Sequence, residues 1–305
     1  IETVEIVRSL EDARRDAATS IPQHVILELC TQRTSCGEFI MQSRFEGIER
    51  PAIGMETAQR IFDQLSVADN VVLTLTGVGD PLLHPQFDKV IRIAKQSGMR
   101  AVHVQTELLT DRESLDRLLD SGVDVVSVDL HADRNETYQA MLGVDRFHEV
   151  LSSIEFLANH RQRLTLPNGT RGYGLPWIVP RMRRCRTTYD DIRSFYDRWQ
   201  HTLGTVMLEG LPPFDPTPQH PDDDLRAEFK PAPVISRDLD TRMVILSDGS
   251  IPVSEMDLCG NDVVGNVESS DLPALWNALL SQRHALREQN ERGAQPPEAL
   301  RTFWP

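Results

Sequence analysis

The chain has 305 residues, a formal net charge of −14 and four cysteines. Its hydrophobic content of 40% and charged content of 26% are typical of a globular protein large enough for a barrel-sized core. The acidic balance argues against nucleic acid or an anionic membrane as a partner, and no apolar run reaches the roughly 20 residues of a membrane span. Four scattered cysteines do not make a disulfide framework, so we expect a cytoplasmic protein.

Apolar runs and amphipathic segments alternate along the first two thirds of the chain. Val4, Val7 and Leu10 recur at helical spacing and predict a lead-in helix over residues 1–20. Strands are then expected at 25–29, 71–76, 100–105, 124–130, 175–180 and 205–208, each apolar on both faces. Helices are expected at 50–66, 87–97, 111–120, 146–160 and 189–200. This order predicts an α/β fold, a partial (β/α)6 TIM-like barrel over residues 21–209.

The composition changes after residue 209. Seven prolines crowd residues 210–240 and exclude regular helix or central strand, so this stretch is expected to be a connector. Residues 241–305 are predicted to form a small α+β appendage, with a hairpin over 243–253 that turns at Asp248-Gly249. A helix over 271–288 follows, with Leu275, Trp276, Leu279 and Leu280 as its apolar face.

Two strand ends carry the most informative motifs. The first expected strand leads into a loop with Cys30 and Cys36, and the second ends in Gly77-Val78-Gly79-Asp80-Pro81. Together they resemble the radical SAM superfamily over residues 21–290. In that family a C-x3-C-x2-C loop holds a [4Fe–4S] cluster, and a G-x-G-E-P-like turn binds the amino group of S-adenosylmethionine. Here Asp80 stands in place of the glutamate.

The resemblance implies a set of S-adenosylmethionine-binding residues at the carboxyl ends of the strands, which meet on one rim in a barrel. They are Gly77, Gly79, Asp80 and Pro81 after the second strand, Thr106 after the third, Ser127 and Asp129 on the fourth, and Arg183 on the fifth. The alternative is that each polar group caps its own loop, with Asp80 as the cap of a tight turn.

The cysteine loop departs from the family pattern. Three thiolates must reach one small cube, so their close spacing is a physical need. With Cys36 as the middle ligand, Gln32 and Phe39 stand at the outer two places, and Cys30 lies at a strand end as a small buried hydrophobe. We expect no conventional [4Fe–4S] cluster. The alternative is an unusual cluster held by Cys30, Cys36 and a third group, such as Cys185, Cys259, Glu38 or His24.

The appendage is similar to the SPASM or twitch domains of the same family, which bind auxiliary clusters through a P-x-C-C-x-D motif. The corresponding stretch here is Pro252-Val253-Ser254-Glu255-Met256-Asp257, followed by Gly265-Asn266 and Trp276. Ser254 and Glu255 replace the two cysteines, so no auxiliary cluster is expected.

Three functions remain open. The first is a binding or partner protein with an S-adenosylmethionine-type cavity, a pseudoenzyme whose partner is an active radical SAM paralogue, a peptide or a small molecule. The second is an active radical SAM enzyme that modifies a peptide or small metabolite with an unusual cluster. The third is a non-radical enzyme that uses S-adenosylmethionine. The sequence holds no nucleophile elbow, P-loop or histidine metal motif, which excludes the usual hydrolytic and phosphoryl-transfer sites.

Overall fold

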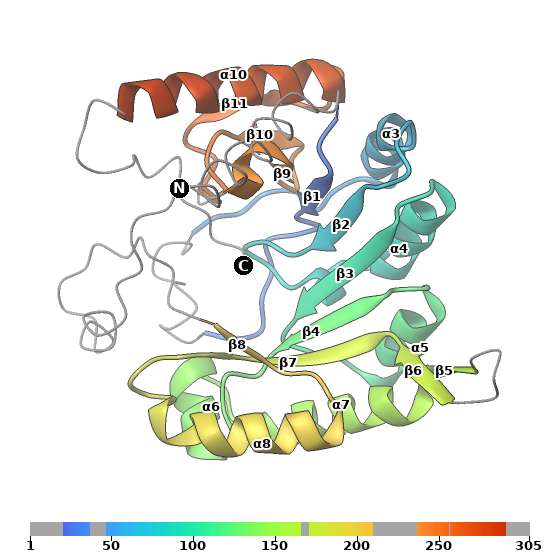
Figure 1. Ribbon diagram of the computed structural model, residues 1–305, viewed down its shortest axis with the longest axis vertical. Coiled ribbons are helices and arrows are strands. Elements are labelled where there is room, and N and C mark those ends of the chain that lie inside the picture. Colours follow the sequence, from blue (N-terminus) through green and yellow to red (C-terminus); the bar gives the residue numbers. More distant parts are fainter. Residues whose placement is uncertain (1–20, 37–46, 166–170, 210–236, 256, 291–305) are drawn as a thin grey trace, which may run out of the picture.

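The computed structural model describes residues 21–36, 47–165, 171–209, 237–255 and 257–290 (Figure 1). Its centre is a seven-stranded sheet in the order β8-β7-β4-β3-β2-β1-β9, and every neighbouring pair is parallel. The strands are β1 (His24–Leu27), β2 (Val72–Leu75), β3 (Ala101–Thr106), β4 (Val125–Asp129), β7 (Trp177–Arg183), β8 (Met207–Glu209) and β9 (Arg242–Ile245). The sheet is open, with β8 and β9 at its two edges, which confirms the predicted partial barrel.

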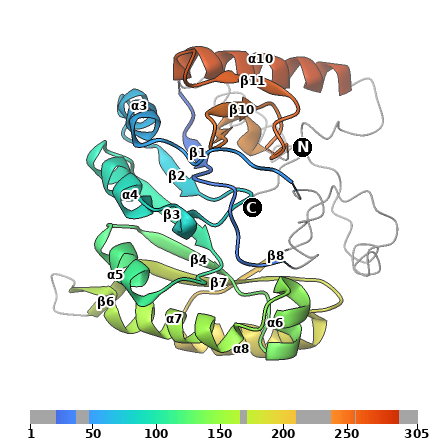
Figure 2. The same ribbon diagram turned by 180° about the vertical axis from the view of Figure 1, so that it is seen from behind.

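The helices between the strands lie along one face of the curved sheet (Figures 1 and 2). They are α3 (Met55–Leu65), α4 (Phe87–Gln96), α5 (Arg112–Asp120), α6 (Asn135–Leu142), α7 (Phe147–His160) and α8 (Ile192–Thr202). The short 3-10 helices η2 (Pro81–Leu83), η3 (Tyr189–Asp191) and η4 (Arg237–Asp240) are also present. No helix in these described ranges is both long and apolar enough to cross a membrane.

The two faces of the sheet differ in chemistry. Residues that point toward the helices, among them Leu27, Leu73, Val104, Val126 and Ile178, are fully buried and form the main core. The alternate residues form an inner face that is polar and in part only half-buried, with His24, Thr74, His103, Gln105, Ser127, Asp129 and Arg181. The prediction that the strands are apolar on both faces is therefore wrong, because helices cover only one of them.

One short helix and one pair of short strands were not predicted. Helix α6 precedes α7 and ends at Gly143, whose φ of 72° gives the helix a left-handed C-cap. The strands β5 (Gln162–Thr165) and β6 (Arg171–Leu175) pair as an antiparallel two-stranded unit before β7. As a result β7 begins at Trp177, two residues later than expected.

The C-terminal segment is joined to the barrel rather than packed on its own. Strand β9 pairs with β1, while β10 (Ser250–Pro252) pairs with β11 (Val263–Asn266). The expected turn at Asp248-Gly249 is present, and the Leu246 N–H donates across it to the Ser250 carbonyl at 2.9 Å, but β9 and β10 do not pair as the two strands of a hairpin. Trp276 of α10 (Leu272–Asn290) belongs to the main core, whereas Val244 packs with Ile26. The lead-in helix and most of the connector lie outside the described residues, and the domain boundaries stay a prediction.

Candidate functional site

Buried carboxylates fasten the loops that follow the first three strands. Glu28, directly after β1, is fully buried and receives three hydrogen bonds from the guanidinium of Arg50 at 2.7–3.0 Å. The same carboxylate accepts from the backbone N–H of Val78 at 2.9 Å and of Ser247 at 3.2 Å. Glu28 therefore ties β1 to the turn after β2 and to the turn after β9.

Asp80 makes the second of these connections. It is the N-cap of η2, and its Oδ1 accepts from the Leu82 N–H at 2.9 Å. The Thr106 hydroxyl contacts both carboxylate oxygens at 2.8–2.9 Å, and the Glu107 N–H donates to Oδ2 at 2.8 Å. Burial raises the pKa of Asp80, and these hydrogen bonds oppose that shift. The side chain thus caps a turn and joins β2 to β3.

Glu107 makes the third connection, from β3 to the loop that carries the cysteines. Its buried carboxylate accepts from the Ser35 N–H at 3.1 Å and from the Ser35 hydroxyl. The Nε of Arg33 lies 3.4 Å from Glu107 Oε1. Burial raises the pKa of Glu107, whereas the positive charge of Arg33 lowers it.

The glycines of the second motif allow this loop to pack closely. A Cβ on Gly79 would lie 2.4 Å from the Cys30 carbonyl oxygen and 2.6 Å from that of Gln32. A Cβ on Gly77 would lie 2.6 Å from the Glu28 side chain. The Asp80 N–H donates to Gln32 O at 2.8 Å, so the two motifs are in direct backbone contact.

A row of polar side chains crosses the inner face of the sheet from β9 to β4. Arg242 Nε donates to His24 Nδ1 at 3.1 Å, and His24 Nε2 lies 2.9 Å from Thr74 Oγ1. That hydroxyl lies 3.3 Å from His103 Nδ1, and His103 Nε2 lies 2.8 Å from Ser127 Oγ. Burial, with the positive charge of Arg181, lowers the pKa of His103 to about 4, so its imidazole is neutral at pH 7.

A second cluster of polar side chains lies at the carboxyl ends of β4, β7 and β8. Arg181 bonds to Asp129 at 3.2 Å and pairs with Glu209, and Gln105 donates to Asp129 at 3.0 Å. Burial disfavours the charged form of Asp129, but the positive charges near it, Arg181 first among them, and the Gln105 hydrogen bond together hold the pKa below its usual range. The buried His131 accepts the Arg183 backbone N–H at 3.1 Å through Nδ1.

The four cysteines do not form one donor set. The Cys30 thiol is buried and donates to the Asp80 carbonyl at 3.3 Å, and burial raises its pKa to about 11, which disfavours the thiolate. Cys36 is exposed and contacts the Gly143 carbonyl at 3.2 Å. Cys185 is buried against Met141, and Cys259 is exposed between β10 and β11. Within the described ranges, no three His, Cys, Asp or Glu side chains are grouped so that they could hold a metal ion. These residues therefore do not fit a three-thiolate [4Fe–4S] cluster.

In the C-terminal segment, buried polar cross-links include Glu255, one of the two positions at which the SPASM or twitch resemblance places cluster ligands. Glu255 is fully buried and lies 3.3 Å from Arg242 Nη1, which extends the inner-face row to the loop after β10. Arg283 of α10, also fully buried, donates to the carbonyls of Val253, Leu239 and Arg242 at 2.6–3.0 Å. The segment is thus held by buried guanidinium groups as well as by apolar packing.

The residues singled out in the sequence fall into two groups at the carboxyl ends of the strands. One joins the cysteine loop to the second motif, with Gly77, Gly79, Asp80, Pro81, Thr106 and Cys30. The other lies on β4 and β7, with Ser127, Asp129 and Arg183. Cys36 contacts the end of α6 instead. Sequence reasoning missed Glu28, Arg33 and Arg242. The signal for Glu28 was a single acid within the apolar run VILEL.

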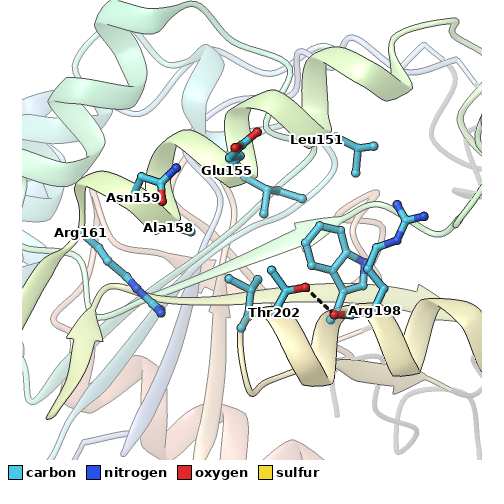
Figure 3. Close-up of a pocket in the computed structure, with 10 residues that line it drawn as sticks. Leu151, Glu155, Ala158, Asn159, Arg161, Arg198 and Thr202 are labelled. Carbon is cyan, nitrogen blue, oxygen red and sulfur yellow. Dashed lines mark hydrogen bonds between the residues drawn. The ribbon is translucent and has the colours of Figure 1, made fainter. Parts of the chain in front are cut away.

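A separate cavity of about 440 Å³ lies between α7 and α8, on the helical side of the molecule (Figure 3). Leu151, Trp199 and Leu203 give it apolar walls, and Arg161 and Arg198 line it with polar groups. None of its lining residues is a predicted site residue, so this cavity does not belong to the site at the strand ends.

Comparison with known proteins agrees with this arrangement. The family model described as the radical SAM superfamily matches residues 30–176. An uncharacterized protein of Treponema pallidum is 24% identical over 295 residues, which cover 90% of this chain and 77% of that protein. The probable GTP 3',8-cyclase of Saccharolobus islandicus is 36% identical over 81 residues, but these span only 27% of this chain and 26% of the cyclase.

The solved structures that share the fold are more distant in sequence. Streptococcus suis SuiB bound to S-adenosylmethionine superposes with a TM-score of 0.64 at 13% identity, over 90% of this chain and 70% of SuiB. The anSMEcpe complex with AdoMet and the Cp18Cys peptide gives 0.62 at 10% identity, over 85% and 81%. The complex of BtrN with AdoMet and 2-DOIA gives 0.52 at 13% identity, over 91% and 92%. Residues 30–176 of this chain thus match the radical SAM superfamily model, and the chain shares the open parallel barrel of these solved structures.

Proposed function

We propose that this chain is a radical SAM-fold binding protein that works without the conventional [4Fe–4S] cluster. What it binds is a peptide, a small molecule or an active radical SAM paralogue. The bound molecule contacts the polar inner face of the sheet and the carboxyl ends of the strands. A cytoplasmic location and the absence of an auxiliary cluster are part of this proposal. The fold alone does not select among these ligands, because one scaffold carries many functions.

The observation that carries the proposal is the placement of the thiols. A cluster with an open iron needs three thiolates that face one point. Cys30 instead donates its proton to the Asp80 carbonyl inside the protein, while Cys36 faces the end of α6. The loop between them is bound along its length through Gln32, Arg33 and Ser35. Gathering a third ligand would require this loop to give up those bonds.

The class of ligand is suggested by two features. SuiB was solved with the precursor peptide SuiA, anSMEcpe with the Cp18Cys peptide, and BtrN with AdoMet and 2-DOIA. In this chain the inner face presents the neutral imidazole of His103, a threonine and an Asp129–Arg181 pair, which suit hydrogen bonding to amide or hydroxyl groups. S-adenosylmethionine is the reference small molecule for binding tests, because SuiB and anSMEcpe were solved with it.

The test is the iron and sulfide content of protein reconstituted anaerobically. We expect well under one [4Fe–4S] cluster per chain, with the same result for Cys36→Ala and Cys30→Ala. A stoichiometric cluster with broad visible absorbance that Cys36→Ala abolishes would refute the proposal. That outcome would leave an active radical SAM enzyme with an unusual cluster as the function.

A further inference from the structure

Arg33 lies in the middle of the bound loop and reaches into the acidic end of the sheet. Its side chain is only 12% exposed, and its Nε is 3.4 Å from the fully buried carboxylate of Glu107. Its positive charge also acts on Asp80, which follows β2, and on Asp129 and His131 at the end of β4. One guanidinium from the cysteine loop thus lies among the acids that surround the family's cofactor position.

The buried carboxylates near Arg33 differ in whether another cation neutralises them. Glu28 has its own partner in Arg50, and Asp129 has Arg181. Among the described residues, Arg33 is the cation that acts on both Asp80 and Glu107. A buried carboxylate without a cation costs several kcal/mol unless it becomes protonated. These two acids therefore depend on the charge that the loop supplies.

The hydrogen-bonding capacity of Asp80 is also largely used. A carboxylate has about four acceptor positions, and this one is contacted by the Leu82 N–H, the Glu107 N–H and, at both oxygens, the Thr106 hydroxyl. An incoming ammonium group would need a free position on Asp80 and an uncompensated negative charge. These three donors leave at most one acceptor position on Asp80, and Arg33 already supplies positive charge to this carboxylate.

We propose that Arg33 is an internal ligand of this site: its guanidinium supplies the positive charge that the ammonium group of a ligand such as S-adenosylmethionine would otherwise bring. The inference rests on the proposed function, since it assumes that the strand ends are the ligand-binding end. It makes Arg33 a specificity-determining residue. The wild-type protein then excludes amino-acid-like ligands from this position, and removal of the side chain opens a site for a small cation.

The experiment is chemical rescue of Arg33→Ala. We expect a lower melting temperature for this variant, and we expect millimolar methylguanidinium, compared with equal sodium chloride, to restore part of the loss. Wild type and Arg193→Ala, a change of a fully exposed arginine on α8, should show no such gain. In calorimetry, S-adenosylmethionine should bind Arg33→Ala at least ten-fold more tightly than wild type. No rescue, or equal binding to wild type and variant, overturns the inference.

A second variant covers the case in which Arg33→Ala does not fold. Arg33→Met combined with Glu107→Gln removes the pair together, so the double variant should be less destabilised than the sum of the single changes. Additive losses would show that the two side chains are not coupled and would overturn the inference. Iron content separates this result from the proposed function: a cluster in wild type refutes the function, whereas tight S-adenosylmethionine binding by cluster-free wild type refutes only the role of Arg33.

Discussion

The substitution His131→Asn should make the protein more resistant to acid. His131 follows β4, has a φ of 54°, and is buried with its Nδ1 accepting the Arg183 N–H at 3.1 Å. Asparagine is one of the residues that tolerate this left-handed backbone, and its Oδ1 can accept the same hydrogen bond. The change therefore keeps the contact and removes only the titrating group.

The magnitude follows from the shift in the histidine pKa. Burial lowers the pKa of His131 from 6.5 to about 3; Arg183, Arg181 and Arg33 add to this, and Asp129 opposes it. Below pH 6.5 the unfolded chain takes up a proton at this residue and the folded chain does not, so folded stability falls as the pH falls. Each pH unit well below 6.5 costs about 1.4 kcal/mol, which amounts to roughly 3 kcal/mol between pH 6.5 and 4.

The assay is urea unfolding of wild type and His131→Asn at several pH values from 7.5 to 4, followed by circular dichroism. Other titrating groups, including Asp80 and Glu107 whose raised pKa values act in the opposite direction, are common to both proteins and cancel in the difference. At pH 7 the variant should be close to wild type or slightly less stable, and at pH 4 it should be more stable. A stability difference that stays constant over this range would refute the buried neutral imidazole. His201→Asn, at an exposed position of α8, controls for the exchange itself.

Three further changes test other parts of the structure. Trp276→Ala, at a core side chain only 1% exposed, should cost on the order of 3–5 kcal/mol in urea unfolding, and an unchanged midpoint would contradict its place in the core. Arg283→Met should lower the free energy of unfolding by on the order of 3 kcal/mol or more, because three buried carbonyls lose their hydrogen-bond donor. Gln282→Met, at the exposed position next to it on α10, serves as the control. Equal losses of stability in the two variants would contradict the cross-link. Asp80→Asn should lower the melting temperature by removing the charge-assisted cap of η2 and the bond from the Glu107 N–H, and a variant as stable as wild type would show that these bonds contribute little.

Much of the barrel could be predicted because its signals are local. The six strands of the expected barrel all occur, and the helix over 146–160 is observed as α7, since both depend on apolar spacing within a short window. Apolar spacing within a short window could not predict the pairing of β9 with β1. The DG turn after β9 is a local signal, and its backbone bond from Leu246 to Ser250 is present, whereas the pairing of β9 with β1 joins segments far apart in the sequence.

The candidate site was predicted in its position but not in its bonding. Gly79 and Asp80 lie at the expected strand end, as the order of β and α units requires. Their contacts, however, are made by Gln32 and Glu107, which local patterns leave undistinguished from other loop residues. Whether a carboxylate faces a ligand or its own loop depends on which backbone N–H groups the fold brings near it. That information lies in the tertiary structure.

The pairing of β9 with β1 also has a consequence for the order of folding. His24 and Arg242 are neighbours in the sheet although they are 218 residues apart in the chain. During synthesis β1 emerges about 218 residues before the strand that pairs with this edge. Until then β1 has one open edge, and unpaired strand edges are where other chains add and aggregation begins. Closing so long a loop is also slow compared with forming local helices. Translation that pauses before residue 242 should therefore leave a nascent chain that depends on chaperones.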